Sequence, residues 1–241
     1  MTTVTKRKLL VLDLNGALLF RPKHKKSRTC HPRPYLSTFT SFLFHPATRE
    51  WLDTMVWSSA QPKNVGWMVE RAFGQHVDKL KLVWTRDQMG LSKAEYGRKT
   101  QTTKDLSRVW ASLGDFDGKD TILLDDSPSK ARLQPYNHIC VEEYTRSAQG
   151  AAEKEDDLVA KMGSLSLGVD DDDETLLAVI GILDSIKSED DVAKWVKGGG
   201  LSSGKIAEVS QWYTNPDILR DWARLGKQAL DALPQAEPVA V

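Results

Sequence analysis

Residues 9–18 read Leu9-Leu10-Val11-Leu12-Asp13-Leu14-Asn15-Gly16-Ala17-Leu18, a short apolar run that ends in a carboxylate, a carboxamide and a glycine. An apolar run of this length is typical of a buried strand in a parallel sheet. Because ligands of open α/β sheets bind beyond the carboxyl ends of the strands, Asp13 would then stand at the mouth of a site. A strand followed by an ordinary turn at Asn15-Gly16 explains the same residues equally well, so the rest of the chain decides.

Two later segments repeat the pattern of an apolar run followed by polar residues. Residues 55–57 lead into Ser58-Ser59, and residues 121–124 lead into Asp125-Asp126-Ser127-Pro128. Each is interpreted as a further strand that carries polar groups at its carboxyl end.

A helix is predicted between these two strands. Residues 106–113 carry apolar side chains at i, i+3, i+4 and i+7, and Gly114 is a typical helix stop, so the helix is expected to begin near Lys104. A lysine in the first turn opposes the positive end of the helix dipole. A nearby anion therefore explains Lys104 better than helix stability does.

The order of these residues resembles that of haloacid-dehalogenase-like phosphatases, and more narrowly that of RNA polymerase C-terminal-domain phosphatases and their small relatives. The matching elements are Asp13, Arg33-Pro34-Tyr35-Leu36, Lys104-Asp105-Leu106-Ser107-Arg108, Leu124-Asp125-Asp126-Ser127-Pro128 and a closing helix over 173–183. The resemblance runs from about Lys8 to about Val196. It implies an α/β fold, a Rossmann-like parallel sheet flanked by helices.

The resemblance also implies the roles of the polar groups. Asp13 is implied as the nucleophile that attacks phosphorus and becomes an aspartyl-phosphate. Ser58 would donate a hydrogen bond to a phosphoryl oxygen, and Lys104 would neutralise the phosphoryl oxygens. Ser59 is assigned to substrate binding.

A magnesium site follows from the same resemblance. The implied ligands of Mg²⁺ are the carboxylates of Asp13 and Asp126 and the main-chain carbonyl of Asn15, with Asp125 in support. Oxygen ligands of this kind suit Mg²⁺. Without a cation, these carboxylates would repel one another and raise each other's pKa values.

Asn15 departs from the family pattern. The usual aspartate at this position protonates the leaving oxygen and later deprotonates the hydrolytic water, and a carboxamide does neither. Three explanations stay open: a natural pseudophosphatase, a slow enzyme that uses another group, or an Asp-to-Asn change introduced on purpose. The neighbouring Gly16-Ala17-Leu18 also differs from the usual Thr-bearing run, which favours natural divergence.

A basic insert follows the Asp13 segment. The insert consists of Arg21, Lys23, His24, Lys25, Lys26 and Arg28, and of these Lys25 and Arg28 are assigned to substrate binding. Their position favours an anionic or phosphorylated partner. A solvated hairpin explains the basic run about equally well.

The composition predicts a protein of the nucleus or cytoplasm. The 241 residues contain no apolar stretch long enough to span a membrane, and the N-terminus lacks the apolar stretch of a signal peptide. Cys30 and Cys140 are expected to be free thiols, as is usual in a reducing compartment. Lysine plus arginine and aspartate plus glutamate both number 33, so no nucleic-acid partner is expected.

The chain is divided by composition into a domain at 1–198, a linker rich in glycine and serine at 199–204, a helical tail at 205–233 and a disordered end at 234–241. An acidic, mobile loop is expected at about 147–173 within the domain. In the tail, Asn215 and Pro216 form a predicted helix start. The apolar stripe that follows either packs back on the domain or docks a protein partner.

The function predicted from these observations is Mg²⁺-dependent phosphomonoester hydrolysis on a phosphoprotein, at serine or threonine, with turnover impaired by Asn15. The alternative is a pseudophosphatase that binds phosphorylated partners or acts as a scaffold.

Overall fold

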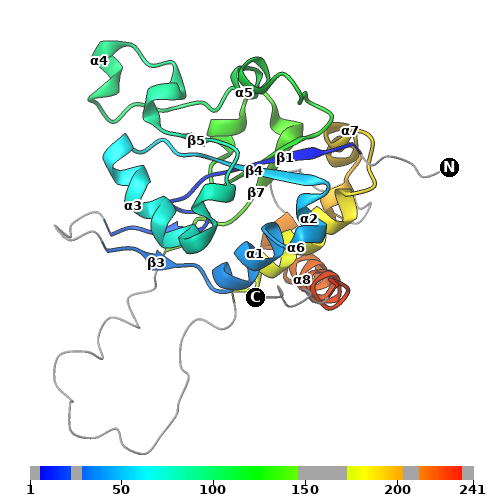
Figure 1. Ribbon diagram of the computed structural model, residues 1–241. Helices are drawn as coiled ribbons and strands as arrows, with labels where there is room; N and C mark the ends of the chain where they lie inside the picture. Colours follow the sequence, from blue (N-terminus) through cyan, green and yellow to red (C-terminus); the bar gives the residue numbers. More distant parts are fainter. Residues whose placement is uncertain (1–5, 23–28, 146–172, 203–211, 235–241) are drawn as a thin grey trace, which may run out of the picture.

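The computed structural model describes residues 6–22, 29–145, 173–202 and 212–234 (Figure 1). Its centre is a five-stranded sheet in the order β5-β4-β1-β6-β7, in which every pairing is parallel. In sheet order the strands are β5 Val83–Trp84, β4 Leu52–Trp57, β1 Lys8–Leu12, β6 Thr121–Asp125 and β7 His138–Cys140. The predicted α/β fold with a parallel sheet is therefore confirmed.

Strand β1 lies in the middle of this sheet because its side chains are apolar on both faces. Leu9 and Val11 face one core, and Leu10 and Leu12 face the other, all of them fully buried. Leu12 is in register with Val56 of β4 and with Leu124 of β6. The three strands thus end together, and the polar residues that follow them emerge at one edge.

Helices cover both faces of the sheet (Figure 1). The core on the Leu10 face includes residues of α1, α3, α6 and α8, whereas that on the Leu9 face includes residues of α5. The helices are α1 Leu36–Leu43, α2 Pro46–Arg49, α3 Pro62–Phe73, α4 Lys93–Tyr96, α5 Leu106–Leu113, α6 Thr175–Ile186, α7 Val192–Lys197 and α8 Pro216–Asp231. The 3₁₀ turns are η1 Gly74–Lys79, η2 Arg86–Met89, η3 Pro128–Ala131, η4 Pro135–Asn137, η6 Gly200–Ser202 and η7 Trp212–Thr214. A small hairpin of β2 Leu19–Phe20 and β3 His31–Pro32 completes the fold.

Helix α8 packs against α6, so the apolar stripe predicted in the tail packs on the domain. Asn215 caps α8 as predicted, since its side-chain oxygen accepts hydrogen bonds from the N–H groups of Asp217 and Ile218. Trp222 and Ala223 are buried in the same core as the residues of α6. The stripe is therefore covered by the chain itself, and the alternative of a partner docking on this face loses its support.

The glycine- and serine-rich linker predicted at 199–204 contains a folded turn among its described residues, 199–202. Residues 200–202 form η6, and Leu201 is buried. Its carbonyl oxygen accepts a hydrogen bond of 2.9 Å from Nε1 of Trp222. Composition misses this anchor because the packing partner lies 21 residues later in the chain.

Glycines allow the two helices to approach closely. A Cβ at Gly226 would overlap the carbonyl oxygen of Leu177, and one at Gly181 would overlap the carbonyl oxygen of Trp222. Backbone atoms of this kind cannot move aside as a flexible side chain can.

Gly226→Ala is expected to lower the free energy of unfolding by about 1–3 kcal/mol because the added methyl group overpacks this contact. The matched control is Gly66→Ala on α3, where an added Cβ meets nothing within 4 Å. That control is expected to gain about 0.5–1 kcal/mol through helix propensity. Urea unfolding monitored by circular dichroism measures both, and equal gains in the two variants would contradict the close packing of α6 and α8.

Arg33 joins three segments that are distant in sequence. Its guanidinium donates hydrogen bonds to the carbonyl oxygens of Ala17 and Glu142, at 3.1 and 3.0 Å. It also donates to the carboxylate of Asp173 at 2.8 Å and to the hydroxyl of Thr175 at 3.1 Å. The arginine is buried, so these bonds satisfy its charge and hold the start of α6 next to the segment that follows β7.

Candidate active site

The carboxyl ends of β1, β4 and β6 bring the predicted polar groups to one edge of the sheet. Asp13 follows β1 and its N–H donates to the carbonyl oxygen of Leu124, at 2.9 Å. Ser58 follows β4, and Asp125 is the last residue of β6. All three of these polar residues are almost completely buried. The structure thus places them where open α/β sheets bind their ligands.

Lys104 lies among these groups and is completely buried. Its Nζ is 2.8 Å from Oδ1 of Asp13 and 2.5 Å from Oδ2 of Asp125. One correction concerns its backbone: α5 begins at Leu106 and is capped by Asp105, so Lys104 precedes the helix and is not in its first turn. The helix begins after Asp105 because the Asp105 side chain accepts a hydrogen bond from the N–H of Ser107 and so caps the amino end. The anions that balance Lys104 are the two carboxylates.

Asp13, Asp125 and Asp126 form a carboxylate cluster, with one oxygen from each lying within 4.8 Å of the others. Asp126 approaches the chain closely at Gly16, which has a φ of 96° and where a Cβ would lie 2.5 Å from Oδ2 of Asp126. Only glycine adopts this conformation readily and leaves the required space. Hard carboxylate oxygens at this spacing fit the requirements of Mg²⁺.

The carboxylates of the cluster differ in pKa. Burial, together with the charges of Asp13 and Asp125, raises the pKa of Asp126 to about 7, although Lys130 opposes the rise. Burial acts on Asp125 in the same direction, but Lys104 and Lys130 outweigh it and hold the pKa of Asp125 well below its usual range. The charge of Asp125 is therefore neutralised within the protein, whereas Asp126 lacks enough positive charge around it.

Lys130 is a residue of this site that the sequence analysis missed. Its Nζ lies 3.1 Å from Oδ1 of Asp125, and 3.5 Å from both Oδ2 of Asp13 and Oδ1 of Asp126. The lysine belongs to η3, the short turn after the acidic pair. The spacing of four residues from Asp126 is the signal that points to this contact.

Asn15 lies in the turn between β1 and β2. Its Oδ1 accepts a hydrogen bond of 2.9 Å from the N–H of Arg21. Next to it, the N–H of Gly16 donates to the carbonyl oxygen of Leu19 at 2.8 Å. The carboxamide oxygen thus helps to fix the turn beside Asp13, and the group has no proton to exchange with a substrate.

Of the three residues assigned to substrate binding, the structure describes Ser59 but not Lys25 or Arg28. Ser59 is partly exposed next to Ser58, and its carbonyl oxygen accepts a hydrogen bond of 3.4 Å from Arg86. Lys25 and Arg28 lie outside the described residues, as does nearly all of the loop expected at 147–173. The free thiols are as predicted, with both Cys30 and Cys140 buried and unpaired by a disulfide.

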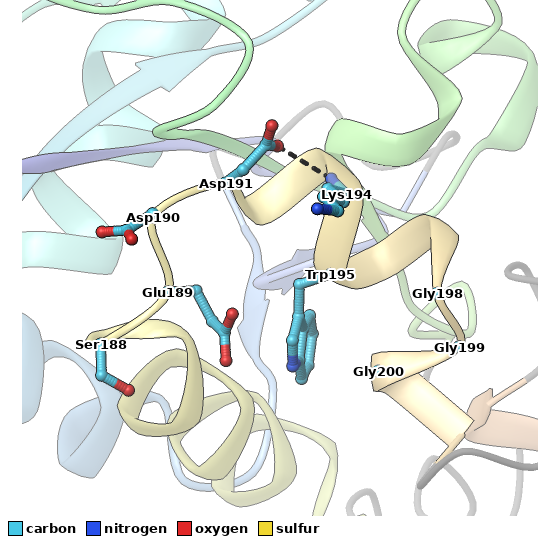
Figure 2. Close-up of a pocket in the computed structure, with 9 residues that line it drawn as sticks. All are labelled: Ser188, Glu189, Asp190, Asp191, Lys194, Trp195, Gly198, Gly199 and Gly200. Atoms are coloured by element: carbon cyan, nitrogen blue, oxygen red, sulfur yellow. Dashed lines mark hydrogen bonds between the residues drawn. The ribbon is translucent and has the colours of Figure 1, made fainter.

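A cavity of about 560 Å³ lies elsewhere, at the turn between α6 and α7 (Figure 2). Its lining residues are Ser188, Glu189, Asp190, Asp191, Lys194, Trp195 and Gly198 to Gly200. The carbonyl oxygen of Glu189 accepts a hydrogen bond from Nζ of Lys8, the first residue of β1. The cavity therefore belongs to the amino end of the sheet, opposite the carboxylate cluster.

Each helix in the part of the chain that the structure describes is too short or too polar to span a lipid bilayer.

Comparison with known proteins gives a family match across these elements. Residues 8–193 match the NLI interacting factor-like phosphatase family. An uncharacterized FCP1 homology domain-containing protein of the fission yeast Schizosaccharomyces pombe is 35% identical in an alignment of 169 residues that covers 63% of this chain and 67% of that protein.

Two solved structures of Fcp1, an RNA polymerase II CTD phosphatase, are also similar to this chain. The fission yeast structure bound to beryllium fluoride has 15% identity and a TM-score of 0.43, and the match covers 92% of this chain and 64% of that one. The second has 15% identity and a TM-score of 0.42, with 93% and 63% covered. This chain thus spans less than two thirds of either structure. Because the family match runs from β1 into α7 and includes every residue of the carboxylate cluster, the chain belongs to the NLI interacting factor-like phosphatase family.

Proposed function

We propose that the protein hydrolyses phosphomonoesters on a phosphoprotein, at phosphoserine or phosphothreonine, through an aspartyl-phosphate on Asp13. The observation that carries the proposal is the pairing of Asp13 with Lys104. Oδ1 of Asp13 accepts a hydrogen bond from Nζ of this fully buried lysine, which fixes the carboxylate at the end of β1. A carboxylate held in this way is oriented, as a nucleophile must be.

The proposed reaction has two steps. An oxygen of Asp13 attacks phosphorus, and the bond from phosphorus to the substrate oxygen breaks with its electron pair leaving on that oxygen, which takes a proton from solvent water. Water then attacks the phosphorus of the aspartyl-phosphate and loses a proton to solvent, and the bond from phosphorus to the Asp13 oxygen breaks, which releases phosphate and restores Asp13. Ser58 is proposed to donate its hydroxyl proton in a hydrogen bond to a phosphoryl oxygen, and Lys104 to balance the charge of the phosphoryl group.

The proposed metal ligands are the carboxylates of Asp13 and Asp126 and the main-chain carbonyl of Asn15, with Asp125 in support. Mg²⁺ bound there would supply positive charge against the phosphoryl oxygens. The raised pKa of Asp126 supports this proposal, because it marks a carboxylate that needs further positive charge to ionise.

Asn15 favours a second candidate function, a pseudophosphatase that binds phosphorylated partners. The carboxamide cannot protonate a leaving oxygen or activate water, and its oxygen is engaged by the N–H of Arg21. Phosphate binding through Ser58 and Lys104 does not depend on this residue. For either function, the proposed location is the nucleus or the cytoplasm, and two buried free thiols suit a reducing compartment.

Mass spectrometry after incubation with acetyl phosphate and Mg²⁺ tests the proposal. The expected result is a phosphate adduct on Asp13, together with slow hydrolysis of an aryl phosphate. Asp13→Asn is expected to abolish both, and Asp78→Asn, which changes an exposed aspartate of η1, is expected to leave both unchanged. An adduct that persists in Asp13→Asn would contradict the assignment. Capture of phosphopeptides without any adduct would favour the pseudophosphatase.

A further inference from the structure

The second lysine of the site, Lys130, contacts the carboxylates that are proposed to hold the metal. Its Nζ lies within 3.5 Å of one oxygen from each of Asp13, Asp125 and Asp126. We propose that Lys130 is an internal countercation that occupies this position when no divalent ion is bound, and so weakens the binding of Mg²⁺. The inference rests on the proposed function, because it takes these carboxylates as the metal-binding groups.

The two lysines divide the oxygens of the carboxylate cluster between them. Lys104 contacts Oδ1 of Asp13 and Oδ2 of Asp125. Lys130 contacts the other oxygen of each, Oδ2 of Asp13 and Oδ1 of Asp125, and also reaches Oδ1 of Asp126. Among the described ion pairs, those of Lys104 are with Asp13 and Asp125 and not with Asp126. Lys130 is the lysine that lies where the three carboxylates converge.

A divalent ion and the Lys130 ammonium group would compete for these oxygens. Both are cations, and each would have to lie within a few ångströms of the same three carboxylates. Like charges at that separation repel strongly inside a protein, where the effective dielectric constant is lower than in water. Binding of the metal therefore requires Lys130 to withdraw.

The surroundings of the two lysines decide which of them can move. The side chain of Lys104 is 0% exposed, so it cannot leave the cluster without opening the core. The side chain of Lys130 is 15% exposed and extends from the short turn η3. A lysine side chain has a flexible stem of four carbons, so Lys130 is able to turn toward solvent.

Binding of Mn²⁺, followed by electron paramagnetic resonance, and of Mg²⁺, followed by calorimetry, tests the proposal on the full chain. Lys130→Met is expected to bind both ions about 10-fold more tightly, within the range typical of coupled binding events. Lys130→Arg keeps the charge and is expected to bind like the native protein. Lys79→Met, on the exposed turn η1, is the control and is expected to bind like the native protein as well.

Thermal melting adds a readout that separates competition from a purely structural role. Without metal, Lys130→Met is expected to melt below the native protein, because the carboxylates lose a counterion; saturating Mg²⁺ is expected to close that gap. If Lys130→Met does not fold, Lys130→Gln, which keeps hydrogen-bond donors without the charge, replaces it in every measurement.

Three outcomes would overturn the proposal. Equal or weaker binding of Mn²⁺ by the neutral variant, with clear binding by the native protein, would refute competition and leave the proposed function intact. A melting gap that Mg²⁺ does not close would assign Lys130 a structural role only. If neither the native protein nor any Lys130 variant binds Mn²⁺ better than Asp126→Asn does, the proposed metal site fails and this inference fails with it.

Discussion

Asn15→Asp is expected to raise steady-state hydrolysis of an aryl phosphate by about 10²-fold or more, because a carboxyl group at this position can supply the general acid and base that the native carboxamide lacks. The substitution suits the local structure. Oδ1 of Asn15 accepts a hydrogen bond from the N–H of Arg21, and an aspartate oxygen can accept the same bond. The gain is therefore expected in turnover, with little change in the fold.

The design of this experiment separates a slow enzyme from a stalled one. Aryl leaving groups need little protonation, so the native protein is expected to show one burst of product and then only slow turnover, because the aspartyl-phosphate accumulates. Asn15→Ala is the control that removes the hydrogen bond without adding an acid. Peptide mapping must verify Asn15 in fresh samples, because an asparagine before Gly16 is prone to deamidation. Native turnover as fast as that of Asn15→Asp would refute the bottleneck and indicate a different acid or base.

Lys104→Met is expected to lower the free energy of unfolding by about 3–5 kcal/mol, the usual cost of removing one partner from a buried ion pair. Asp13 and Asp125 are both buried, and each accepts a hydrogen bond from Nζ of Lys104. In the variant, two buried carboxylates face one another with less positive charge beside them. Urea unfolding at neutral pH, with and without Mg²⁺, measures the loss.

A double variant identifies the cause of that loss. Lys104→Met combined with Asp125→Asn removes one charge of each sign, so it is expected to recover part of the lost stability, as a double-mutant cycle would show for residues in contact. Lys79→Met on the surface is expected to change the stability by less than about 0.5 kcal/mol. A loss below about 1 kcal/mol in Lys104→Met would mean that water reaches the carboxylates and screens them.

Features that depend on neighbouring residues could be predicted from the sequence. The apolar run of β1, the helical period of α5 and the cap of α8 by Asn215 are local patterns, and each predicts its element. The edge of the sheet at which the polar groups gather is predicted as well, because these groups follow directly after their strands.

Features that depend on tertiary contacts could not be predicted in the same way. The helical period predicts α5 but does not show which residue caps it. In the structure this residue is Asp105, so the helix begins after Lys104. The sequence around Gly226 gives no indication that Leu177 lies against it. Lys130 reaches Asp13 only through the tertiary fold, so no pattern within its own segment predicts a contact with that aspartate.

The buried guanidinium of Arg33 has a consequence for how the chain between Glu142 and Asp173 can be engineered. Arg33 bonds to Glu142 on one side of residues 146–172 and to Asp173 on the other, so the two ends of that stretch are held to one side chain whatever lies between them. The entropy of closing a loop rises slowly with its length, by about 0.6 kcal/mol for each doubling. A change in the length of chain between Glu142 and Asp173 is therefore expected to cost the rest of the domain little stability, so a reporter is expected to be tolerated there.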